Sequence, residues 1–301
     1  MNRLIDQIAS DAKITDKVLL EKDLYLHKLL LAISKDEYLQ ENLAFKGGTC
    51  LIKCYLGYYR FSEDLDFTWA KQEEFEKKSQ KEIRKIVSQN TNKILKIIEE
   101  ITHQLNLGFK PEKNNLKYIE LGGSNKFLTI KIWYESEVLK AQQFIKIQIN
   151  FLEKIYYSFK TLRAESIVKN INPEEFEFLF PEHKGLLEAP RVKCYDIKEI
   201  LAEKVRAILT RRGTKARDFI DIFIITRKEK IKLATLRKQI IEKTKFMMRY
   251  SKYVKNLKDF RLDKFLMEEE EKLLLKPLGP GFETFLKETQ AYILELIAEL
   301  K

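Results

Sequence analysis

The spacing of apolar residues predicts helices at the two ends of the chain. Over residues 1–42, apolar positions recur at intervals of three and four, the period of a helix that buries one face. Asp16 precedes the second of these runs and is expected to cap it. The same period returns over residues 71–107, in a long charged helix, and again from Asp196 to residue 300, with breaks at glycine and proline. The chain is therefore expected to begin and end in amphipathic helices.

A period of two residues marks the middle of the chain and predicts strands. Residues 116–121 and 127–134 alternate between apolar and polar positions, with a glycine-containing turn between them. Residues 144–151, FIKIQINF, place isoleucines on one face and Lys146, Gln148 and Asn150 on the other. A strand over residues 64–69 completes the predicted sheet.

These patterns predict an α+β fold in two domains. The strands and the N-terminal helices form a mixed sheet with flanking helices in residues 1–160, and a helical domain occupies residues 161–301. Asp196 and Glu199 have the spacing of a capping box at the start of the first C-terminal helix. A short helix is expected over residues 49–58, before the strand at 64–69.

The charge balance points toward an anionic partner. The chain has 301 residues with a formal net charge of +11, and its pI is near 9.2. Such a bias favours RNA, DNA or a nucleotide as partner. The alternative is a lysine-rich composition that serves solubility alone. Hydrophobic residues make up 45% of the chain, enough for a packed core.

Cysteine usage and hydropathy suggest a cytoplasmic protein. Only Cys50, Cys54 and Cys194 are present, which gives no disulfide framework and is typical of a reducing compartment. With three histidines in the whole chain, we expect packing cysteines and no zinc site. No apolar run reaches the length of a membrane span, and the N-terminus lacks the apolar core of a signal peptide.

The stretch over residues 45–69 carries a candidate metal site. Asp64 and Asp66 are two apart on the predicted strand, so their side chains project from the same face while Leu65 and Phe67 enter the core. Two adjacent carboxylates repel each other, and a divalent cation removes that cost. Mg²⁺ prefers one or two protein carboxylates together with phosphate oxygens. The pair therefore predicts Mg²⁺, or Mn²⁺ in its place, bound with a nucleoside triphosphate.

A Gly-Gly-Thr turn upstream supplies a candidate phosphate site. Gly47 and Gly48 let the backbone approach a phosphate closely, and the helix that follows offers unpaired N–H groups. Thr49 is expected either to cap that helix or to bind a phosphate. Each motif is weak when it stands alone, because Asp-x-Asp is common at solvated edges and Gly-Gly is common in turns. Their spacing, among apolar neighbours, favours phosphoryl or nucleotidyl transfer.

A second group of charges lies about 140 residues downstream. Lys204 sits on or beside an apolar helical stripe, where its charge must reach solvent or meet an anion, and Arg211 lies two turns further on. Asp218 and Asp221 are three apart and neighbours on the next helix. The structural alternative is a salt bridge from Arg217 or Lys215 to these aspartates.

The first stretch resembles a known enzyme superfamily. Gly-Gly-Thr, a short helix and Asp-x-Asp are similar to the signature of polymerase-beta-like nucleotidyltransferases. More narrowly, Lys46 to Thr49, KGGT, followed by residues 60–67, RFSEDLDF, resembles the AbiEii/AbiGii-type toxins of abortive-infection and toxin–antitoxin systems. Glu21-Lys22-Asp23 also fits the N-terminal helix of that family. The resemblance implies nucleotide binding by Lys46, Gly47, Gly48, Thr49, Arg60 and Ser62, and metal binding by Asp64 and Asp66.

The downstream segment resembles the second conserved block of the same family. Residues 199–223 read EILAEKVRAILTRRGTKARDFIDIF. The resemblance implies that Lys204 contacts nucleotide phosphate and that Asp221 acts as base or site organiser. It also implies that Arg211, Arg217 and Asp218 contribute to the cleft. Lys204 and Asp221 thus join Asp64 and Asp66 as candidate catalytic residues.

One departure from the superfamily concerns a third carboxylate on a later strand. Gln148 and Asn150 stand on residues 144–151 where an acid is expected, so this strand offers neutral oxygens. Either two carboxylates suffice, or Glu153 or Glu135 takes the third place.

The resemblance implies a toxin that transfers a nucleoside monophosphate from an NTP to an acceptor and releases pyrophosphate. The acceptor known for relatives is the 3′ end of tRNA, and a protein hydroxyl is the other option. A cognate antitoxin protein, encoded beside the toxin, is the implied partner. The alternative is a non-catalytic RNA- or partner-binding module on the same scaffold. A small-molecule nucleotidyltransferase of the aminoglycoside type fits the basic surface and the second block less well.

Overall fold

The computed structural model describes residues 1–213, 215–260 and 272–300, and the chain divides into two compact units. The first unit comprises residues 1–153 and 159–194, and the second comprises residues 154–158 and those from 195 onward. We expected the change at residue 160. It comes after Cys194 because the chain returns to the sheet for two further short strands.

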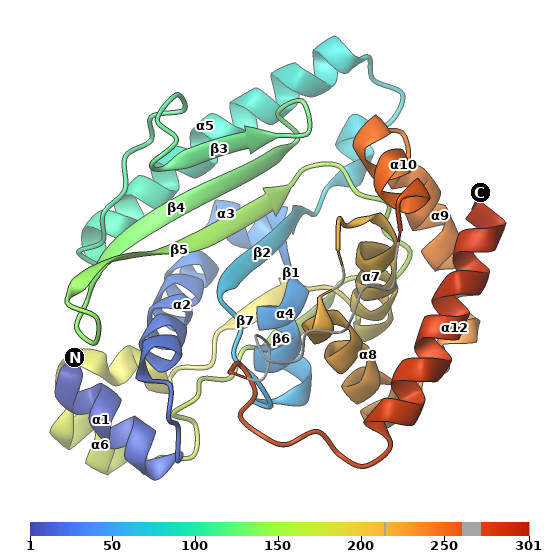
Figure 1. Cartoon of the computed structure of the whole chain (residues 1–301). Helices are drawn as coiled ribbons and strands as arrows, with labels where there is room; N and C mark the ends of the chain where they lie inside the picture. Colours follow the sequence, from blue (N-terminus) through green and yellow to red (C-terminus); the bar gives the residue numbers. More distant parts are fainter. Residues whose placement is uncertain (214, 261–271, 301) are drawn as a thin grey trace. The chain divides into compact units, whose positions relative to one another are not determined.

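The first unit is built on a seven-stranded mixed sheet in the order β3-β4-β5-β2-β1-β7-β6 (Figure 1). Strands β2 and β5 pair in parallel, as do β1 and β7, while the other neighbours are antiparallel. The strands are β1 (Leu43–Lys46), β2 (Asp64–Trp69), β3 (Ile119–Gly122), β4 (Phe127–Ser136), β5 (Ala141–Asn150), β6 (Lys160–Arg163) and β7 (Arg191–Cys194). The α+β class with a mixed sheet is thus confirmed.

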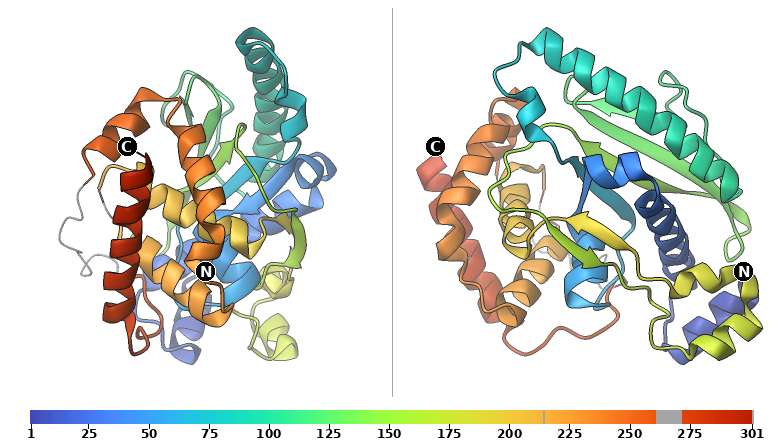
Figure 2. Two further views of the ribbon diagram at one scale, coloured as in Figure 1. Left: turned by 90° about the vertical axis from the view of Figure 1, so that its right-hand side faces the viewer. Right: turned by 180° about the vertical axis from the view of Figure 1, so that it is seen from behind.

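One face of the sheet is apolar and covered by helices. Leu65 and Phe67 on β2 align with Ile147 and Ile149 on β5, and all four are buried. Helix α2 (Lys17–Lys35) contacts β2 and β5 and packs against α5 (Gln80–Gln104), which lies along the same face (Figure 2). The remaining elements of this unit are α1 (Asn2–Asp11), α3 (Glu37–Asn42), α4 (Gly47–Cys50), η1 (Leu51–Leu56), η2 (Gln72–Phe75), α6 (Pro173–Leu179) and η3 (Pro181–Leu187). The opposite face carries the polar side chains of β2 and β5.

Local chemistry explains where the helices of this unit begin. Asp16 accepts a hydrogen bond from the Leu19 amide, so the predicted cap of α2 is confirmed. The helix expected over residues 71–107 is instead two helices, because Lys77 adopts a positive φ of 54° and Ser79 forms a capping box with Glu82. The helix expected over 49–58 starts earlier, at Gly47, and continues from Leu51 as a π-helix.

The second unit is helical. Its elements are α7 (Ile197–Thr210), α8 (Ala216–Lys228), η4 (Leu233–Leu236), α9 (Arg237–Met247), α10 (Ser251–Lys258) and α12 (Phe282–Leu300). Helix α7 contacts α8, α9, α10 and α12 and forms the centre of this unit. The helical pattern predicted from Asp196 to residue 300 runs through residues 261–271, which lie outside the described residues. No helix among the described residues is long and apolar enough to cross a membrane.

The capping box expected at the start of α7 is wrong, although Asp196 is the N-cap residue. Asp196 caps the helix by accepting from the Lys198 amide. Glu199 is used elsewhere: its Oε2 accepts from the backbone N–H groups of Tyr156 and Tyr157, at 2.9 and 3.0 Å. This carboxylate therefore anchors the short segment 154–158 to the helical unit.

Candidate active site

The turn after β1 brings the backbone into close contact with a carboxylate of β2. Gly47 adopts a left-handed φ of +76°. A Cβ atom at this position would lie 2.2 Å from Oδ2 of Asp66. Such a distance is far below van der Waals contact, so Asp66 occupies the space that a side chain would need. Glycine is required here for its conformation and for its missing side chain.

The second glycine is enclosed by the next part of the same motif. A Cβ at Gly48 would lie 2.7 Å from Nη2 of Arg60 and 2.9 Å from Oγ of Ser62. Arg60 is only 2% exposed, and its Nη1 donates to the Phe61 carbonyl at 2.6 Å. The fold thus brings Arg60 and Ser62 to the Gly-Gly turn, as the motif suggested.

Thr49 links the turn to β2 in a way that we did not predict. Its Oγ1 donates to the backbone carbonyl of Asp64 at 2.5 Å. The N-cap position of α4 belongs to Lys46, whose side chain makes no capping hydrogen bond. Thr49 therefore does not cap the helix in this structure. Its hydroxyl fixes the start of the carboxylate strand against the turn.

Asp64 and Asp66 project from the polar face of the sheet, as predicted. Both are partly exposed, whereas Leu65 between them is fully buried. Asp66 aligns with Lys46 on β1 and with Gln148 on β5, and Asp64 aligns with Lys146. Aligned residues on neighbouring strands share a face. Gln148 thus stands beside Asp66, at the position where a third carboxylate was expected.

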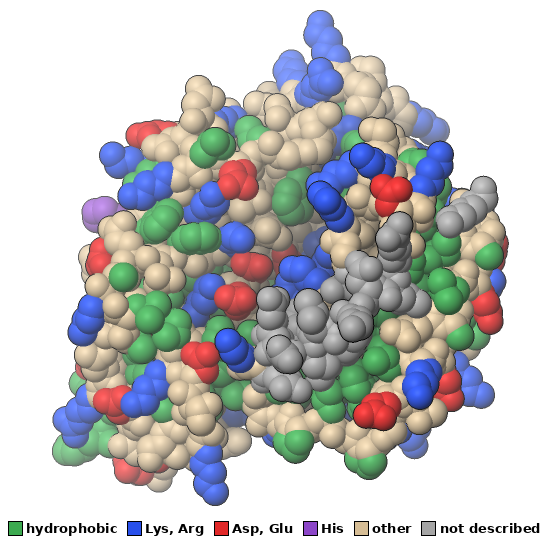
Figure 3. Space-filling view, viewed as in Figure 1, with side chains coloured by type: hydrophobic (Ala, Val, Ile, Leu, Met, Phe, Trp, Pro, Cys, Tyr) green, Lys and Arg blue, Asp and Glu red, His purple; other side chains and the backbone are tan. Residues whose placement is uncertain are grey.

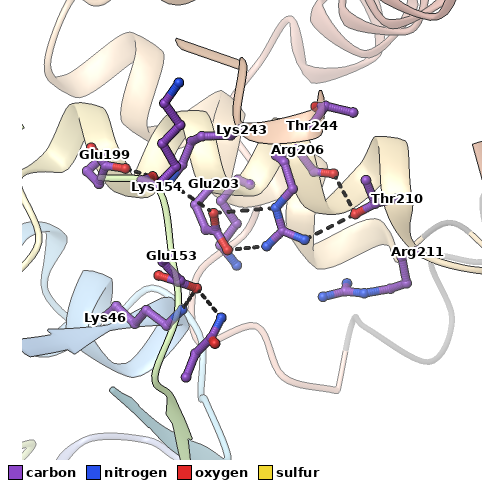
Figure 4. Close-up of polar contacts among 12 residues, drawn as sticks. Lys46, Glu153, Lys154, Glu199, Glu203, Arg206, Thr210, Arg211, Lys243 and Thr244 are labelled. Atoms are coloured by element: carbon purple, nitrogen blue, oxygen red, sulfur yellow. Dashed lines mark hydrogen bonds and ion pairs between the residues drawn. The ribbon is translucent and has the colours of Figure 1, made fainter. Parts of the chain in front are cut away.

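Of the two substitutes considered for that carboxylate, Glu153 lies near this row. It forms an ion pair with Lys46 and accepts from Asn150 Nδ2 at 2.7 Å (Figure 4). Glu135 lies on β4 four residues beyond Lys131, which aligns with Lys146. At about 3.4 Å per residue, this places Glu135 roughly 14 Å along the sheet from the row of Asp64. Glu153 is therefore the acid closer to the pair.

A buried network of hydrogen bonds and ion pairs links α2 to the segment that follows the Gly-Gly turn. From the sequence we singled out only its residues on α2. Lys53 is buried with Asp23 and lies 3.0 Å from its Oδ1, while Tyr58 donates to Asp23 Oδ2 at 2.7 Å. Burial and the Asp23 charge raise the pKa of Tyr58. Glu21 accepts from Ser136 Oγ at 2.5 Å. Charged residues on the apolar stripe of residues 1–42 were the available signal.

His27 on the same helix is buried in its neutral form. Its Nε2 donates to the Glu188 carbonyl at 2.8 Å. Its Nδ1 has no hydrogen-bond partner among the described residues. Burial and the nearby Lys53 charge lower the pKa of His27 to about 3.

The second unit holds the other predicted charges in an ion-pair cluster of Lys204, Arg211, Asp218 and Asp221. Lys204 Nζ lies 2.6 Å from Asp221 Oδ2 and 3.1 Å from Asp218 Oδ1, and Arg211 Nη1 lies 2.5 Å from Asp218 Oδ2. The two aspartates are 2% and 0% exposed. Burial alone raises the pKa of Asp218, but the charges of Lys204 and Arg211 outweigh it and lower that pKa.

The cation partners described for this cluster are Lys204 and Arg211. The salt-bridge alternative considered from the sequence named Arg217 or Lys215 as the partner of the aspartates. The structure pairs the aspartates with Lys204 and Arg211, from α7 and the residue that ends it. Arg217 lies in the first turn of α8 and is partly exposed.

A different set of ion pairs joins α7 to α9. Lys243 Nζ lies 2.6 Å from Glu199 Oε1 and 3.5 Å from Glu203 Oε2, and it is only 4% exposed (Figure 4). Arg206 pairs with Glu203 and donates to Thr210 Oγ1 at 3.1 Å. Charged contacts therefore fix α7 against α8 and against α9.

A basic cavity opens at the C-terminal end of α7. Its volume is about 490 Å³. Lysine and arginine side chains are spread over the face seen in Figure 3, with acidic side chains among them. The local concentration of cations in this cavity is therefore a more specific feature than the overall surface charge. The cavity is lined by Arg211, Arg212, Gly213, Lys252, Lys255, Asn256, Asp259 and Phe260.

The fold thus gathers the predicted residues into two groups, one in each unit. The first unit holds Lys46, Gly47, Gly48, Thr49, Arg60, Ser62, Asp64 and Asp66. The second holds Lys204, Arg211, Arg217, Asp218 and Asp221.

Comparison with one solved structure supports the fold. MenT4, a nucleotidyltransferase toxin from Mycobacterium tuberculosis, is similar over 99% of this chain and 99% of its own, with a TM-score of 0.50 and 17% identity. JHP933 from Helicobacter pylori is similar over 94% of this chain and 98% of its own, with a TM-score of 0.44 and 17% identity. No curated protein sequence matches the chain.

The family assignment comes from the sequence profile of one family. The profile described as nucleotidyl transferase AbiEii toxin, type IV toxin–antitoxin system, matches residues 28–291. This range includes both groups of predicted residues and most of the chain. The resemblance carried by residues 46–49, 60–67 and 199–223 is therefore confirmed. The chain belongs to the AbiEii family of nucleotidyltransferase toxins of toxin–antitoxin systems.

Proposed function

We propose that this nucleotidyltransferase toxin uses Mg²⁺ to transfer a nucleoside monophosphate from an NTP to the 3′ end of a tRNA. The observation that carries the proposal is the contact between the turn and the carboxylate strand. Asp66 fills the side-chain space of Gly47, and Asp64 projects from the same face of β2. Backbone, carboxylates and the cations of Lys46 and Arg60 are thereby concentrated at one place.

The donor set fits a hard divalent cation. Two partly exposed carboxylates lie on one face, with the amide oxygen of Gln148 in the same row. Oxygen ligands of this kind suit Mg²⁺ or Mn²⁺. When bound there, the metal would neutralise triphosphate charge and increase the acidity of the attacking hydroxyl. Asp64 and Asp66 are the residues that would hold it.

The chain itself positions the triphosphate. Gly47 and Gly48 allow the backbone to approach phosphate oxygens, and Arg60 and Ser62 line the second glycine. In the reaction the terminal hydroxyl oxygen of the acceptor bonds to the α-phosphorus. The bond from that phosphorus to the bridging oxygen breaks, pyrophosphate leaves, and the hydroxyl proton passes to water.

We further propose that Lys204 neutralises phosphate charge and that Asp221 positions it. Asp221 is fully buried and lies 2.6 Å from the lysine ammonium, a geometry that suits an organiser better than a general base. Asp218 holds Lys204 and Arg211 together. Arg211 and Arg217 would add further cations for the nucleotide.

A polyanionic acceptor is supported by the basic cavity at the end of α7. Arg211, Arg212, Lys252 and Lys255 line it, together with one carboxylate, Asp259. Clustered lysine and arginine side chains bind nucleic-acid phosphates. RNA is thus favoured over a small neutral acceptor, and the net charge of +11 agrees with this.

The test is transfer of label from each α-³²P-NTP to total tRNA in the presence of Mg²⁺. Wild-type protein should label RNA at its 3′ end, and chelation of Mg²⁺ should abolish labelling. The substitution Asp64→Ala should likewise abolish labelling. The control is Asp16→Asn, which removes a carboxylate in the same unit while keeping the cap of α2, and it should retain activity. Label on protein in place of RNA would contradict the tRNA assignment.

The competing function is a binding module without catalysis, which the neutral Gln148 beside Asp66 favours. Folded wild-type protein that binds tRNA but transfers no label with any NTP would establish that alternative. A toxin of this family is also expected to have an antitoxin. Growth arrest by wild type but not by Asp64→Ala, with rescue by the protein encoded next to the toxin, would support the partnership.

A further inference from the structure

Three cysteine sulfur atoms converge in the first unit, although their positions in the sequence gave no sign of it. The Sγ atoms of Cys50, Cys54 and Cys194 all lie within 4.8 Å of one another. These are all the cysteines of the chain. Cys50 and Cys194 are fully buried, and Cys54 is partly exposed. The sequence showed only the pair four residues apart, because Cys194 lies 140 positions downstream.

The backbone explains why the three meet. Cys50 ends α4 and Cys54 lies in the π-helix η1 that continues it, so both face the same side. Cys194 is the last residue of β7, which pairs in parallel with β1 and aligns Cys194 with Phe45. Strand β1 leads directly into the Gly-Gly turn and α4. The cluster therefore lies next to the Gly-Gly turn, on elements of the first unit.

The surroundings argue against a reactive cysteine. Burial, followed by hydrogen bonds among the three thiols, raises the pKa of Cys50 well above its usual value. The hydrogen bond with Cys194 is the main cause that raises the pKa of Cys54. Nucleophilic and oxidation-prone cysteines have lowered pKa values and are accessible to solvent. Neither condition is met by Cys50.

Ordinary packing explains buried cysteines, but it does not require three of them to share one point. One metal ion with three sulfur ligands at about 2.3 Å holds these sulfur atoms about 3.8 to 4.0 Å apart, in a tetrahedral or a trigonal arrangement. All three sulfur atoms lie within 4.8 Å of one another, so metal binding would draw the most distant pair together by at most about 1 Å. Thiolate sulfur selects zinc and monovalent copper over Mg²⁺.

We propose that Cys50, Cys54 and Cys194 form a three-sulfur site for a thiophilic metal ion, Zn²⁺ or Cu⁺. A bound ion stabilises the elements next to the Gly-Gly turn. On binding, the S–H bonds ionise, metal–sulfur bonds form and the protons pass to solvent, with no change of oxidation state. The charge of the ion stabilises thiolates that burial alone disfavours. The site is separate from the carboxylates of β2 and uses different ligand chemistry.

The first experiment titrates fully reduced protein with Co²⁺, a spectroscopic substitute for Zn²⁺. A thiolate-to-cobalt charge-transfer band in the near ultraviolet, saturating at about one ion per chain, supports the site. Excess Zn²⁺ should remove the band and raise the melting temperature by roughly 5 °C. A parallel titration adds Cu⁺ in the presence of a Cu⁺-specific chelator, which competes with the protein for the ion. A folded wild-type protein with no band and no shift from either ion overturns the proposal.

Variants separate this site from the nucleotidyltransferase centre. Cys54→Ser changes the most exposed of the three cysteines and should abolish the band. If circular dichroism shows that Cys54→Ser is unfolded, Cys54→Ala replaces it, and the wild-type titration remains decisive in either case. Asp66→Asn should lose transfer activity and keep the band. A band that persists in folded Cys54→Ser or Cys54→Ala overturns the proposal.

A thiol count excludes the remaining explanation. Protein purified without reductant and then denatured should react at all three cysteines once a chelator has removed metal. One reactive thiol would mean that two cysteines form a disulfide, and the metal site would be refuted.

Discussion

The two pairs of aspartates in this molecule resolve the same electrostatic problem in opposite ways. Asp64 and Asp66 lie on a strand, partly exposed, beside the neutral Gln148 and the backbone of Gly47. Asp218 and Asp221 lie on a helix, almost fully buried, with the charge of Lys204 shared between them. Both pairs avoid isolated buried charge.

The difference separates two roles for the same residue type. The aspartates of α8 receive their compensating charge from the chain, so they belong to the packing of α7 against α8. The aspartates of β2 stay within reach of solvent and of a bound cation. We therefore expect mutations of the β2 pair to affect activity first and mutations of the α8 pair to affect stability first.

The largest effect should come from Asp66→Asn. Loss of one metal carboxylate should reduce kcat/KM for nucleotidyl transfer by about a thousandfold or more. The melting temperature should change little, because Asp66 is partly exposed. Label transfer and differential scanning fluorimetry measure the two quantities. A large loss of stability with full activity would reverse our assignment of the β2 pair.

Asp221→Asn should give the largest loss of stability. It removes a buried carboxylate that lies 2.6 Å from Lys204, and broken buried pairs cost about 3 kcal/mol. Urea unfolding followed by circular dichroism reports the change. Lys140→Ala, which breaks an exposed pair with Glu137, is the control and should leave the urea midpoint unchanged. Equal midpoints for Asp221→Asn and wild type would mean that the α8 pair contributes little to packing.

Gly47→Ala and Gly57→Ala form a matched pair, since both glycines have a left-handed φ, +76° and +73°. An added Cβ meets Asp66 at position 47 and nothing within 4 Å at position 57. Gly57→Ala should cost about 1–3 kcal/mol from backbone strain alone, because a φ of 73° with a ψ of −179° is adopted almost only by glycine. Gly47→Ala should cost about 1–2 kcal/mol more and should also abolish transfer. Equal losses of stability and activity would show that the contact with Asp66 is unimportant.

Mild acid should weaken the first unit while the ion pairs of α8 persist. The pKa of His27 is lowered to about 3, so below pH 6.5 the unfolded chain binds a proton that the folded chain does not. Stability is then lost as the pH falls, by about 2 kcal/mol between pH 6.5 and 5. The pKa of Asp218 is lowered instead, so its contribution is lost only below the usual aspartate range.

Melting temperatures at pH 7 and pH 5 test this difference. His27→Gln should reduce the loss of stability on acidification, whereas His103→Gln, at an exposed position on α5, should not. If the melting temperatures of wild type and His27→Gln fall by the same amount between pH 7 and pH 5, His27 is not the acid-sensitive group.

Much of the first unit was predictable because its signals are local. The alternation of DLDFTW fixes which side chains enter the core, and β2 has the bounds that we predicted. Asp16 and its helix follow from the same kind of short-range pattern. The family resemblance also named Arg60 and Ser62 as nucleotide-binding candidates, which periodicity alone does not, and both side chains lie beside Gly48.

The remainder depends on contacts between distant parts of the chain. Strands β6 and β7 are four residues each, too short for a periodic signal, and β7 joins the sheet only through its neighbours β1 and β6. The convergence of Cys194 with Cys50 follows from that pairing. Glu199 likewise meets Lys243 and the segment 154–158 through packing that no local pattern encodes.

The π-helix at Leu51–Leu56 has a consequence for the comparison of homologous sequences. A π-turn contains one more residue than the α-turn it replaces, so it corresponds to a single inserted residue. Relatives that keep a regular α-helix here should therefore align with a one-residue gap between the KGGT and RFSEDLDF blocks. An alignment without this gap would match Gly48 correctly but pair Arg60 with the wrong residue of the relative.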